Sequence, residues 1–154
     1  MSSTSPKVRR ASTADLSPLT PIVAALDMFP PEMLGEMIAN PEGLFLVAER
    51  PNSAEVLGFL YAIPEPLTEG TWNMLALGVS PSHQKNGIGR ALVEAIGACL
   101  ALRNARLLIV DTSSTEAFAP ARVFYKRLGY DQVAVIPNYW AAGDDKVIFS
   151  CAVA

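Results

Sequence analysis

Apolar residues recur along this chain at two spacings, and the changes between them predict the order of its secondary-structure elements. Runs with β-strand character alternate with stretches whose apolar positions fall three or four residues apart, as on one helix face. The expected strands are residues 7–11, 44–49, 55–62, 71–79, 106–110, 132–136 and 146–152. The expected helices are a first one after Ser12–Asp15, followed by 30–39, 88–102 and 119–128.

Prolines and glycines predict where these elements stop. Pro21 is expected to shorten the first helix or delay its start. Residues 50–53 are typical of a hairpin turn, and residues 63–70 and 137–145 are expected to be loops. Hairpins combined with strand–helix–strand crossovers predict an α/β fold, with a mixed, mostly antiparallel sheet of about seven strands and about four flanking helices.

Composition narrows the class of protein. The 154 residues, 51% of them apolar and 18% charged, fit one domain spanning 1–154, with disorder expected only at residues 1–6. The net charge of -3, without a dense Lys/Arg run, predicts that nucleic acid is not a partner.

No apolar segment approaches the roughly 20 residues that span a bilayer, so no membrane partner is expected. The N-terminus lacks the apolar core of a secretory signal, so a cytoplasmic location is expected. Cys99 and Cys151 are interpreted as buried apolar side chains, and no metal site is expected.

A glycine-rich turn before the longest predicted helix is the clearest candidate site. It comprises residues 84–90, with Gly87 and Gly89 one residue apart. Backbone N–H groups at a helix start have no partner in the helix, and the helix dipole adds partial positive charge there. This arrangement predicts a diphosphate site, to which Lys85 and Arg90 would add positive charge. Close packing of the turn is the alternative explanation.

Three motifs resemble those of the GCN5-related N-acetyltransferase (GNAT) superfamily. Gln84-x-x-Gly87-x-Gly89 is similar to its pyrophosphate motif, Leu75–Pro81 to the strand before that motif, and Ala121–Tyr130 to its second signature. The resemblance implies the GNAT fold, with acetyl-CoA as co-substrate. It also implies acetyl transfer to a primary amine. The expected mechanism is direct attack by the amine in a ternary complex. A domain that binds acyl-CoA as a sensor without turnover is the alternative.

The resemblance also implies where the cofactor lies. Its pantetheine arm would lie where the strands ending at Val79 and near Asp111 splay apart, and the Val79 N–H would polarise the thioester carbonyl. Many family members carry an asparagine where this chain has Phe118, so the hydroxyl-rich segment 111–116 is a further source of polar contacts. The expected cofactor-binding residues are Leu77, Gly78, Val79, Gln84, Lys85, Asn86, Gly87, Ile88, Gly89, Arg90, Phe118, Arg122 and Phe124.

Tyr125 matches the tyrosine that protonates the departing CoA thiolate in this family. A phenol with a pKa of about 10 can donate that proton, although simple packing in the helix is the alternative. Many relatives carry a carboxylate as base on the strand equivalent to 71–79, which has none here. Asp111 and Glu116 are therefore the candidate bases, each with a purely structural role as the alternative.

The acceptor is expected to be a small-molecule amine, which the sequence does not identify further. Residues 138–140 are expected to form a loop that presents aromatic side chains to the acceptor or to the second subunit of a homodimer. The expected acceptor-binding residues are Phe29, Trp72, Asn73, Tyr139 and Trp140.

Overall fold

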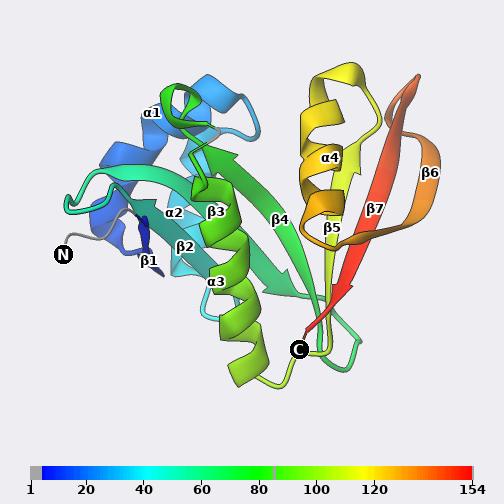
Figure 1. Ribbon diagram of the computed structural model, residues 1–154, viewed down its shortest axis with the longest axis horizontal. Helices are drawn as coiled ribbons and strands as arrows, with labels where there is room; N and C mark the ends of the chain where they lie inside the picture. The colour runs from blue at the N-terminus through cyan, green and yellow to red at the C-terminus, as the bar shows by residue number, and fades with distance from the viewer. Residues whose placement is uncertain (1–4, 85, 154) are drawn as a thin grey trace.

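A seven-stranded sheet organises the chain (Figure 1). The computed structural model describes residues 5–84 and 86–153, so most of the segment expected to be disordered lies outside the description. The strand order is β1-β2-β3-β4-β5-β7-β6; β4 and β5 run parallel, and the other pairs run antiparallel. The strands are β1 (Lys7–Arg10), β2 (Leu44–Glu49), β3 (Val56–Pro64), β4 (Thr71–Val79), β5 (Leu107–Ser113), β6 (Asp131–Ala141) and β7 (Asp144–Ala152). The predicted mixed sheet is confirmed.

Helices cover both faces of the sheet and give the molecule two apolar cores. The four helices are α1 (Leu16–Leu26), α2 (Leu34–Ala39), α3 (Ile88–Leu102) and α4 (Ala119–Arg127). α1 and α2 pack on one face, where Phe59 is fully buried. α3 and α4 pack on the other face, where Phe149 is fully buried (Figure 1). Alternate residues of a strand point to opposite faces, so each central strand contributes to both cores.

α1 is longer than its sequence suggests. It has 11 residues and contains Pro21, which was expected to shorten it. Pro21 lies in the middle of this helix, where proline removes one intrahelical hydrogen bond. Burial of Leu19, Ile22 and Val23 against the sheet stabilises the helix on both sides of this position.

The expected loop over 137–145 is wrong, because most of it is strand. β6 continues to Ala141, and a tight turn at residues 142–143 leads directly into β7. Asn138, with a positive φ of 55°, accommodates a shift of register between Ile136 and Ala141. Its side-chain oxygen accepts the Gly143 N–H at 2.8 Å, which closes the turn. The proline, asparagine and glycine of this segment therefore indicate an irregular strand and a tight turn rather than a loop.

A β-bulge in β4 sets the geometry of the sheet centre. Tyr61 pairs with Ala76 and Ala62 pairs with Met74, so Leu75 is an extra residue without a partner on β3. Leu75 is half exposed. The bulge adds local twist and bends β4 next to β5.

Two further expectations concern the cysteines and the membrane. Cys99 and Cys151 are partly rather than fully buried, and both are free thiols. They lie on different elements, α3 and β7. Within residues 5–84 and 86–153, no helix has the length and apolar character needed to cross a membrane.

A buried ion cluster ties the start of the chain to the sheet. The Arg9 guanidinium donates to both carboxylate oxygens of Asp15, at 2.8 and 2.9 Å, and its Nε lies 3.2 Å from Glu49. The Asp15 carboxylate also accepts the Ser12 N–H at 2.8 Å and is almost fully buried. The hydrogen bonds from Arg9 lower the pKa of the Asp15 carboxyl below its usual value.

Replacing Asp15 with Asn should therefore lower the free energy of unfolding by about 2 kcal/mol at pH 7, since charge-assisted bonds are lost. A carboxyl whose pKa is lower in the folded state stabilises that state above its unfolded pKa of about 3.9. The difference between Asp15→Asn and wild type should shrink as the pH falls below that value. Urea unfolding at several pH values measures it. Asp27→Asn, which changes an exposed carboxylate at the end of α1, is the control.

Candidate functional site

The parallel strands β4 and β5 separate part-way along their length, and the gap between them is the centre of the site. Their pairing runs from Thr71 and Leu107 to Met74 and Val110. Beyond it, residues 76–79 of β4 pair with β3 alone among the described strands. Figure 1 shows the two strands diverging toward the end at which α3 begins.

The open edge of β4 presents backbone hydrogen-bonding groups to the gap. The Ser80 N–H donates to the Leu57 carbonyl on the β3 side, at 2.7 Å. Because backbone groups alternate in direction along a strand, those of Leu77 and Val79 point away from β3, toward the gap. Gln84 Nε2 approaches the Val79 carbonyl at 3.4 Å. The two strand residues expected to pair with a pantetheine arm thus have the right orientation.

The start of α3 carries backbone amides that have no acceptor within the helix. Gly87 caps the helix with a φ of 78°, which favours glycine. The first N–H to bond back into the helix is that of Ala91, which donates to the Gly87 carbonyl at 3.0 Å. The N–H groups of residues 87–90 precede it and have no intrahelical acceptor. Lys85, expected to assist them, lies outside the described residues.

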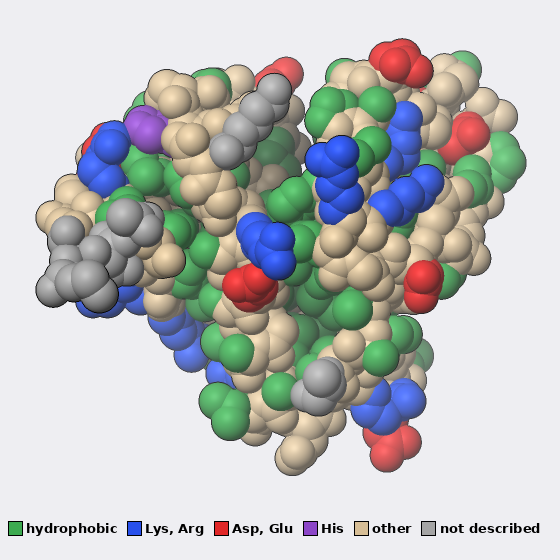
Figure 2. Space-filling view, viewed as in Figure 1, with side chains coloured by type: hydrophobic (Ala, Val, Ile, Leu, Met, Phe, Trp, Pro, Cys, Tyr) green, Lys and Arg blue, Asp and Glu red, His purple; other side chains and the backbone are tan. Residues whose placement is uncertain are grey.

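α4 approaches this helix start closely. A Cβ added at Gly89 would lie 3.3 Å from the Phe124 ring. Figure 2 shows this face hollowed between the part of the molecule that contains α3 and the part that contains α4, with Lys and Arg side chains near the hollow. Arg90 pairs with Glu94 at 2.9 Å, and both side chains are largely exposed. To reach an anion, the Arg90 guanidinium would exchange this exposed ion pair for the new one.

Arg122 has a different setting from the one expected. Its Nη1 donates to the carbonyls of Ser113 and Thr115, at 2.7 and 2.8 Å. It therefore joins the end of β5 to α4. Phe118 is half exposed just before α4.

Tyr125 lies on α4 and is buried among aromatic rings. The nearest centroids are those of Phe124, Phe149 and Tyr130, at 5.4, 5.7 and 5.8 Å. Burial raises the pKa of the Tyr125 phenol well above its usual value. The phenol therefore stays protonated at neutral pH and is a proton donor rather than an ionised group.

A polar cluster occupies the opposite face of the sheet. Asn73 on β4 alternates with the buried core residues Trp72 and Met74, so its side chain lies on the face that carries α1 and α2. Asn73 Nδ2 donates to Glu65 Oε1 at 2.8 Å and approaches Asp111 Oδ2 at 3.4 Å. Lys146 Nζ lies 3.3 Å from the same Asp111 oxygen. Sequence reasoning missed Glu65 and Lys146, because only the strand pairing brings them beside Asp111.

Two aromatic residues of β6 border this cluster. Lys146 Nζ lies 4.3 Å from the centroid of the Tyr139 ring and 5.9 Å from that of Trp140, which are cation–π distances. Trp140 Nε1 donates to the Thr112 carbonyl at 3.2 Å. Both rings are about half exposed. They therefore lie at the surface beside Asp111, on a strand rather than on the expected loop.

The structural comparisons identify the family. Residues 41–132 match the family model of the acetyltransferase (GNAT) domain. The chain belongs to the GNAT family. It is 25% identical to an N-alpha-acetyltransferase of Sulfurisphaera tokodaii, over 94% of this chain and 91% of that protein.

Solved structures agree with this assignment. A GNAT-family protein from Desulfovibrio desulfuricans superimposes with a TM-score of 0.87 and 29% identity, covering 97% of this chain and 99% of that one. An aminoglycoside 6'-N-acetyltransferase complexed with coenzyme A has a TM-score of 0.81 at 21% identity, covering 96% and 97%. The predicted GNAT fold, acetyltransferase activity and acetyl-CoA co-substrate are confirmed. The domain is an enzyme of the acyltransferase class.

The other predicted residues of this GNAT domain are more dispersed. Trp72 faces the α3 side of the sheet, 6.0 Å from the Arg103 guanidinium, and so lies on the opposite face from Asn73. Glu116 is exposed in the short turn before α4. Phe29 packs edge-on against Phe59 at 6.1 Å, on the same side of the sheet as Asn73. The suggested homodimer stays a prediction.

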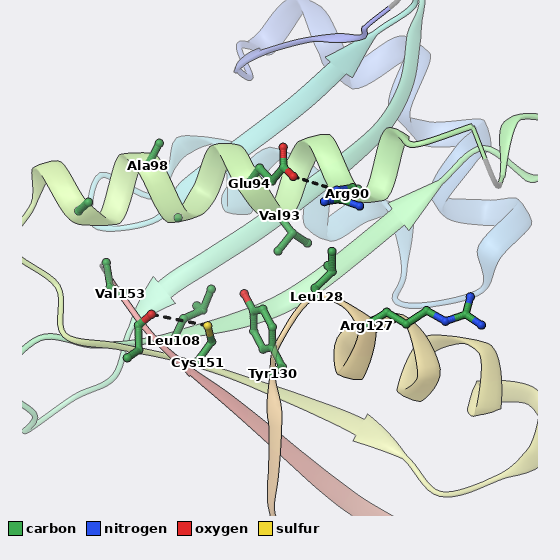
Figure 3. A pocket seen from close by; sticks show the side chains of 13 residues that line it. Arg90, Val93, Glu94, Ala98, Leu108, Arg127, Leu128, Tyr130, Cys151 and Val153 are labelled. Carbon is green, nitrogen blue, oxygen red and sulfur yellow. Dashed lines mark hydrogen bonds and ion pairs between the residues drawn. The ribbon is translucent and has the colours of Figure 1, made fainter.

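A separate groove lies between α3 and the end of α4 (Figure 3). Its volume is about 430 Å³, and Arg90, Leu128, Tyr130 and Cys151 are among its lining residues. Burial raises the pKa of Tyr130 to about 12. The groove touches the diphosphate loop at Arg90, but its lining includes no residue of the Asn73–Asp111 cluster.

The open amides at α3 predict how a substitution at the helix cap should behave. Gly87→Ala places a side chain at positive φ, which costs about 1 kcal/mol and shifts the amides around it. We expect CoA to bind about tenfold more weakly, which corresponds to about 1.4 kcal/mol. Isothermal titration with CoA measures this. Gly97→Ala is the matched control, because it lies in the same helix with open space around it and should leave CoA affinity unchanged.

Proposed function

We propose that this GNAT domain transfers the acetyl group of acetyl-CoA to the primary amine of a small acceptor, by direct attack in a ternary complex. The observation that carries the proposal is the gap between β4 and β5. On one face it meets the amides of residues 87–90, which have no acceptor within α3, and on the other it meets the Asn73–Asp111 cluster. A thioester in this gap is accessible to an amine bound on the acceptor face.

The geometry supports a specific position for acetyl-CoA. Its diphosphate binds the amides of residues 87–90, with Arg90 as a cationic partner. The pantetheine arm follows the open edge of β4. The Leu77 N–H is a better donor to the thioester carbonyl than the Val79 N–H, because it lies on the same edge but two residues closer to Asn73. Such a donor stabilises the negative charge that develops on the carbonyl oxygen during attack.

Asp111 is the better of the two candidate bases. Its side chain is only 17% exposed and lies on β5, just beyond the last residue paired with β4. Glu116 is exposed near α4, with no ion pair among the described residues. An amine with a pKa of about 10 is protonated at neutral pH and must lose a proton before it attacks. Asp111 accepts this proton directly or through water.

Tyr125 completes the reaction by protonating the CoA thiolate. Its raised pKa keeps the phenol protonated at neutral pH, so that its O–H is available to donate to the departing thiolate. No covalent acyl-enzyme is needed: Cys99 and Cys151 lie on α3 and on the part of β7 that faces the groove beside Tyr130, away from the Asn73–Asp111 cluster.

Small acceptors fit the acceptor face. The half-exposed rings of Tyr139 and Trp140 border the cluster, and Phe29 lies on the same side of the sheet. Similar proteins are named for different acceptors, an alpha amine in one and an aminoglycoside in the other. The experiment that tests the function is thiol release from acetyl-CoA with a panel of amino acids, short peptides, aminoglycosides and simple alkylamines. Two outcomes contradict the proposal: thiol release that does not depend on an amine, and no thiol release with any amine in the panel.

Tyr125→Phe should lower kcat for acetyl transfer by about 100-fold or more, because the thiolate loses its proton donor. The ring packing is preserved, so the unfolding midpoint should change little. Steady-state thiol release at saturating acetyl-CoA measures the effect. Tyr130→Phe, which removes the hydroxyl of a neighbouring buried tyrosine, should retain kcat within about threefold.

Asp111→Asn should lower kcat/KM for the acceptor by about 100-fold near pH 7, because the amine no longer has a base. The defect should shrink as the pH approaches the acceptor's own pKa of about 10, where the amine loses its proton unaided. A pH profile of kcat/KM for both enzymes shows this. Glu116→Gln is the control, and an equal loss in that variant would contradict the assignment of the base.

A further inference from the structure

The groove between α3 and the end of α4 contains a thiol that the proposed reaction does not use (Figure 3). Cys151 follows Val147 and Phe149 at alternate positions of β7, so its side chain lies on the same face of the sheet as theirs. Val147 and Phe149 are buried there, whereas Cys151 lines the groove and is a partly buried free thiol. Its sulfur is therefore accessible to a small molecule that enters the groove.

Small side chains on α3 make room for such a molecule. Gly97, Ala98 and Ala101 line this side of the groove, and Leu108 and Leu128 line it from β5 and from the end of α4. The volume of about 430 Å³ falls in the range of about 300–1,000 Å³ that is typical of small-molecule sites.

The Tyr130 hydroxyl points into the same groove without a partner. The residue is 7% exposed, and Figure 3 shows its hydroxyl directed toward α3. It makes no hydrogen bond with any residue that the structure describes. Burial, and after it the charge of the Cys151 thiolate, raise the pKa of Tyr130 to about 12, so the phenol stays protonated at neutral pH. Its O–H can therefore be donated to a Cys151 thiolate in the groove.

The rim of the groove carries more positive than negative charge. Arg90 and Glu94 pair with each other. Arg127 is exposed at the end of α4, with no ion pair or hydrogen bond in the part of the chain that the structure describes. Positive charge near a thiol favours its thiolate form and attracts anionic reagents.

We infer that Cys151 is a modification site, at which the protein exchanges its thiol with a small anionic disulfide such as glutathione disulfide. The thiol first gives its proton to solvent, and the thiolate sulfur attacks one sulfur of the disulfide. A new S–S bond forms to Cys151 as the original S–S bond breaks. The other half leaves as a thiolate and takes a proton from solvent. The Cys151 sulfur is oxidised and the departing sulfur is reduced, so the disulfide itself is the oxidant.

Cys99 provides an internal comparison. It is also a partly buried free thiol, but it lines a different groove, between α3 and the strands β1 and β2. The described residues of that lining include no tyrosine. The arginines in it lie against Asp15, the Gly43 carbonyl and the Trp72 ring. Cys99 therefore lacks both the hydroxyl donor and the unpaired cation.

A mixed disulfide at Cys151 also affects the cofactor. Arg90 lines the groove and lies at the start of α3, where the diphosphate of acetyl-CoA is proposed to bind. The carboxylates of the attached group compete with that diphosphate for the Arg90 guanidinium. This consequence rests on the proposed function, whereas the modification itself does not.

Mass spectrometry of the folded protein after incubation with glutathione disulfide tests the site. Cys99→Ser should gain one glutathionyl group per chain at the wild-type rate, and Cys151→Ser should gain none over the same period. Equal labelling of the two variants, or labelling of wild type only in urea, would overturn the inference.

Tyr130→Phe tests the role of the hydroxyl. It should exchange about tenfold more slowly than wild type, because the thiolate loses its hydrogen-bond donor. The ring packing is kept, so the urea midpoint should match that of wild type. An exchange rate equal to that of wild type would overturn the assignment of the donor.

Arg127→Gln tests the role of charge. It should slow exchange with glutathione disulfide about threefold, and leave exchange with the neutral bis(2-hydroxyethyl) disulfide nearly unchanged. Lys126→Gln is the matched control, since Lys126 is exposed on the same turn but does not line the groove. An equal effect of Lys126→Gln would overturn the preference for an anionic disulfide.

Isothermal titration with CoA tests the consequence. The glutathionylated Cys99→Ser protein should bind CoA about tenfold more weakly than the same protein after reduction with dithiothreitol. Equal affinity before and after reduction would overturn the link to the cofactor. Failure of the reduced protein to bind CoA would instead contradict the proposed function, and would leave the labelling result in place.

Discussion

The separation of β4 from β5 after Met74 and Val110 is the constraint on which the rest of the structure depends. Two parallel strands that stayed paired would use up the backbone groups of Leu77 and Val79 in the sheet. The bulge at Leu75 bends β4 away, and the flanking strands β3 and β7 keep each half of the sheet satisfied. The opening therefore costs hydrogen bonds only along the two short edges that face the gap.

This opening divides the chemistry between the two faces of the sheet. The groups proposed to bind and protonate the leaving thiol lie on the side of α3 and α4, where Tyr125 is buried. The groups proposed to receive the acceptor lie on the side of α1 and α2, around Asn73 and Asp111. Each set is held by its own core, so a change on one face of the sheet need not disturb the geometry of the other.

The order of strands and helices could be predicted from the sequence because it depends on local periodicity. The cap at Gly87 and the tyrosine on α4 could be predicted because a short motif carries them. The polar cluster around Asn73 could be predicted only in part: Asn73 and Asp111 were expected at the site, but Glu65 and Lys146 were not. Glu65, Asn73, Asp111 and Lys146 lie on four separate segments, and only the register of β4, β5 and β7 brings them together. The strand character of residues 137–141 was missed for a related reason, because its pairing with β7 outweighs the local preference of proline and asparagine.

The irregular end of β6 has a consequence for solubility. β6 is the outermost strand, and its Val133, Val135 and Ile136 are exposed. A straight apolar edge of this length is a template on which further chains add as strands and polymerise. Pro137 lacks an N–H to donate, and the left-handed Asn138 turns the backbone out of register directly after it. The two residues confine any regular free edge to a few positions, which protects the folded protein from fibrous aggregation.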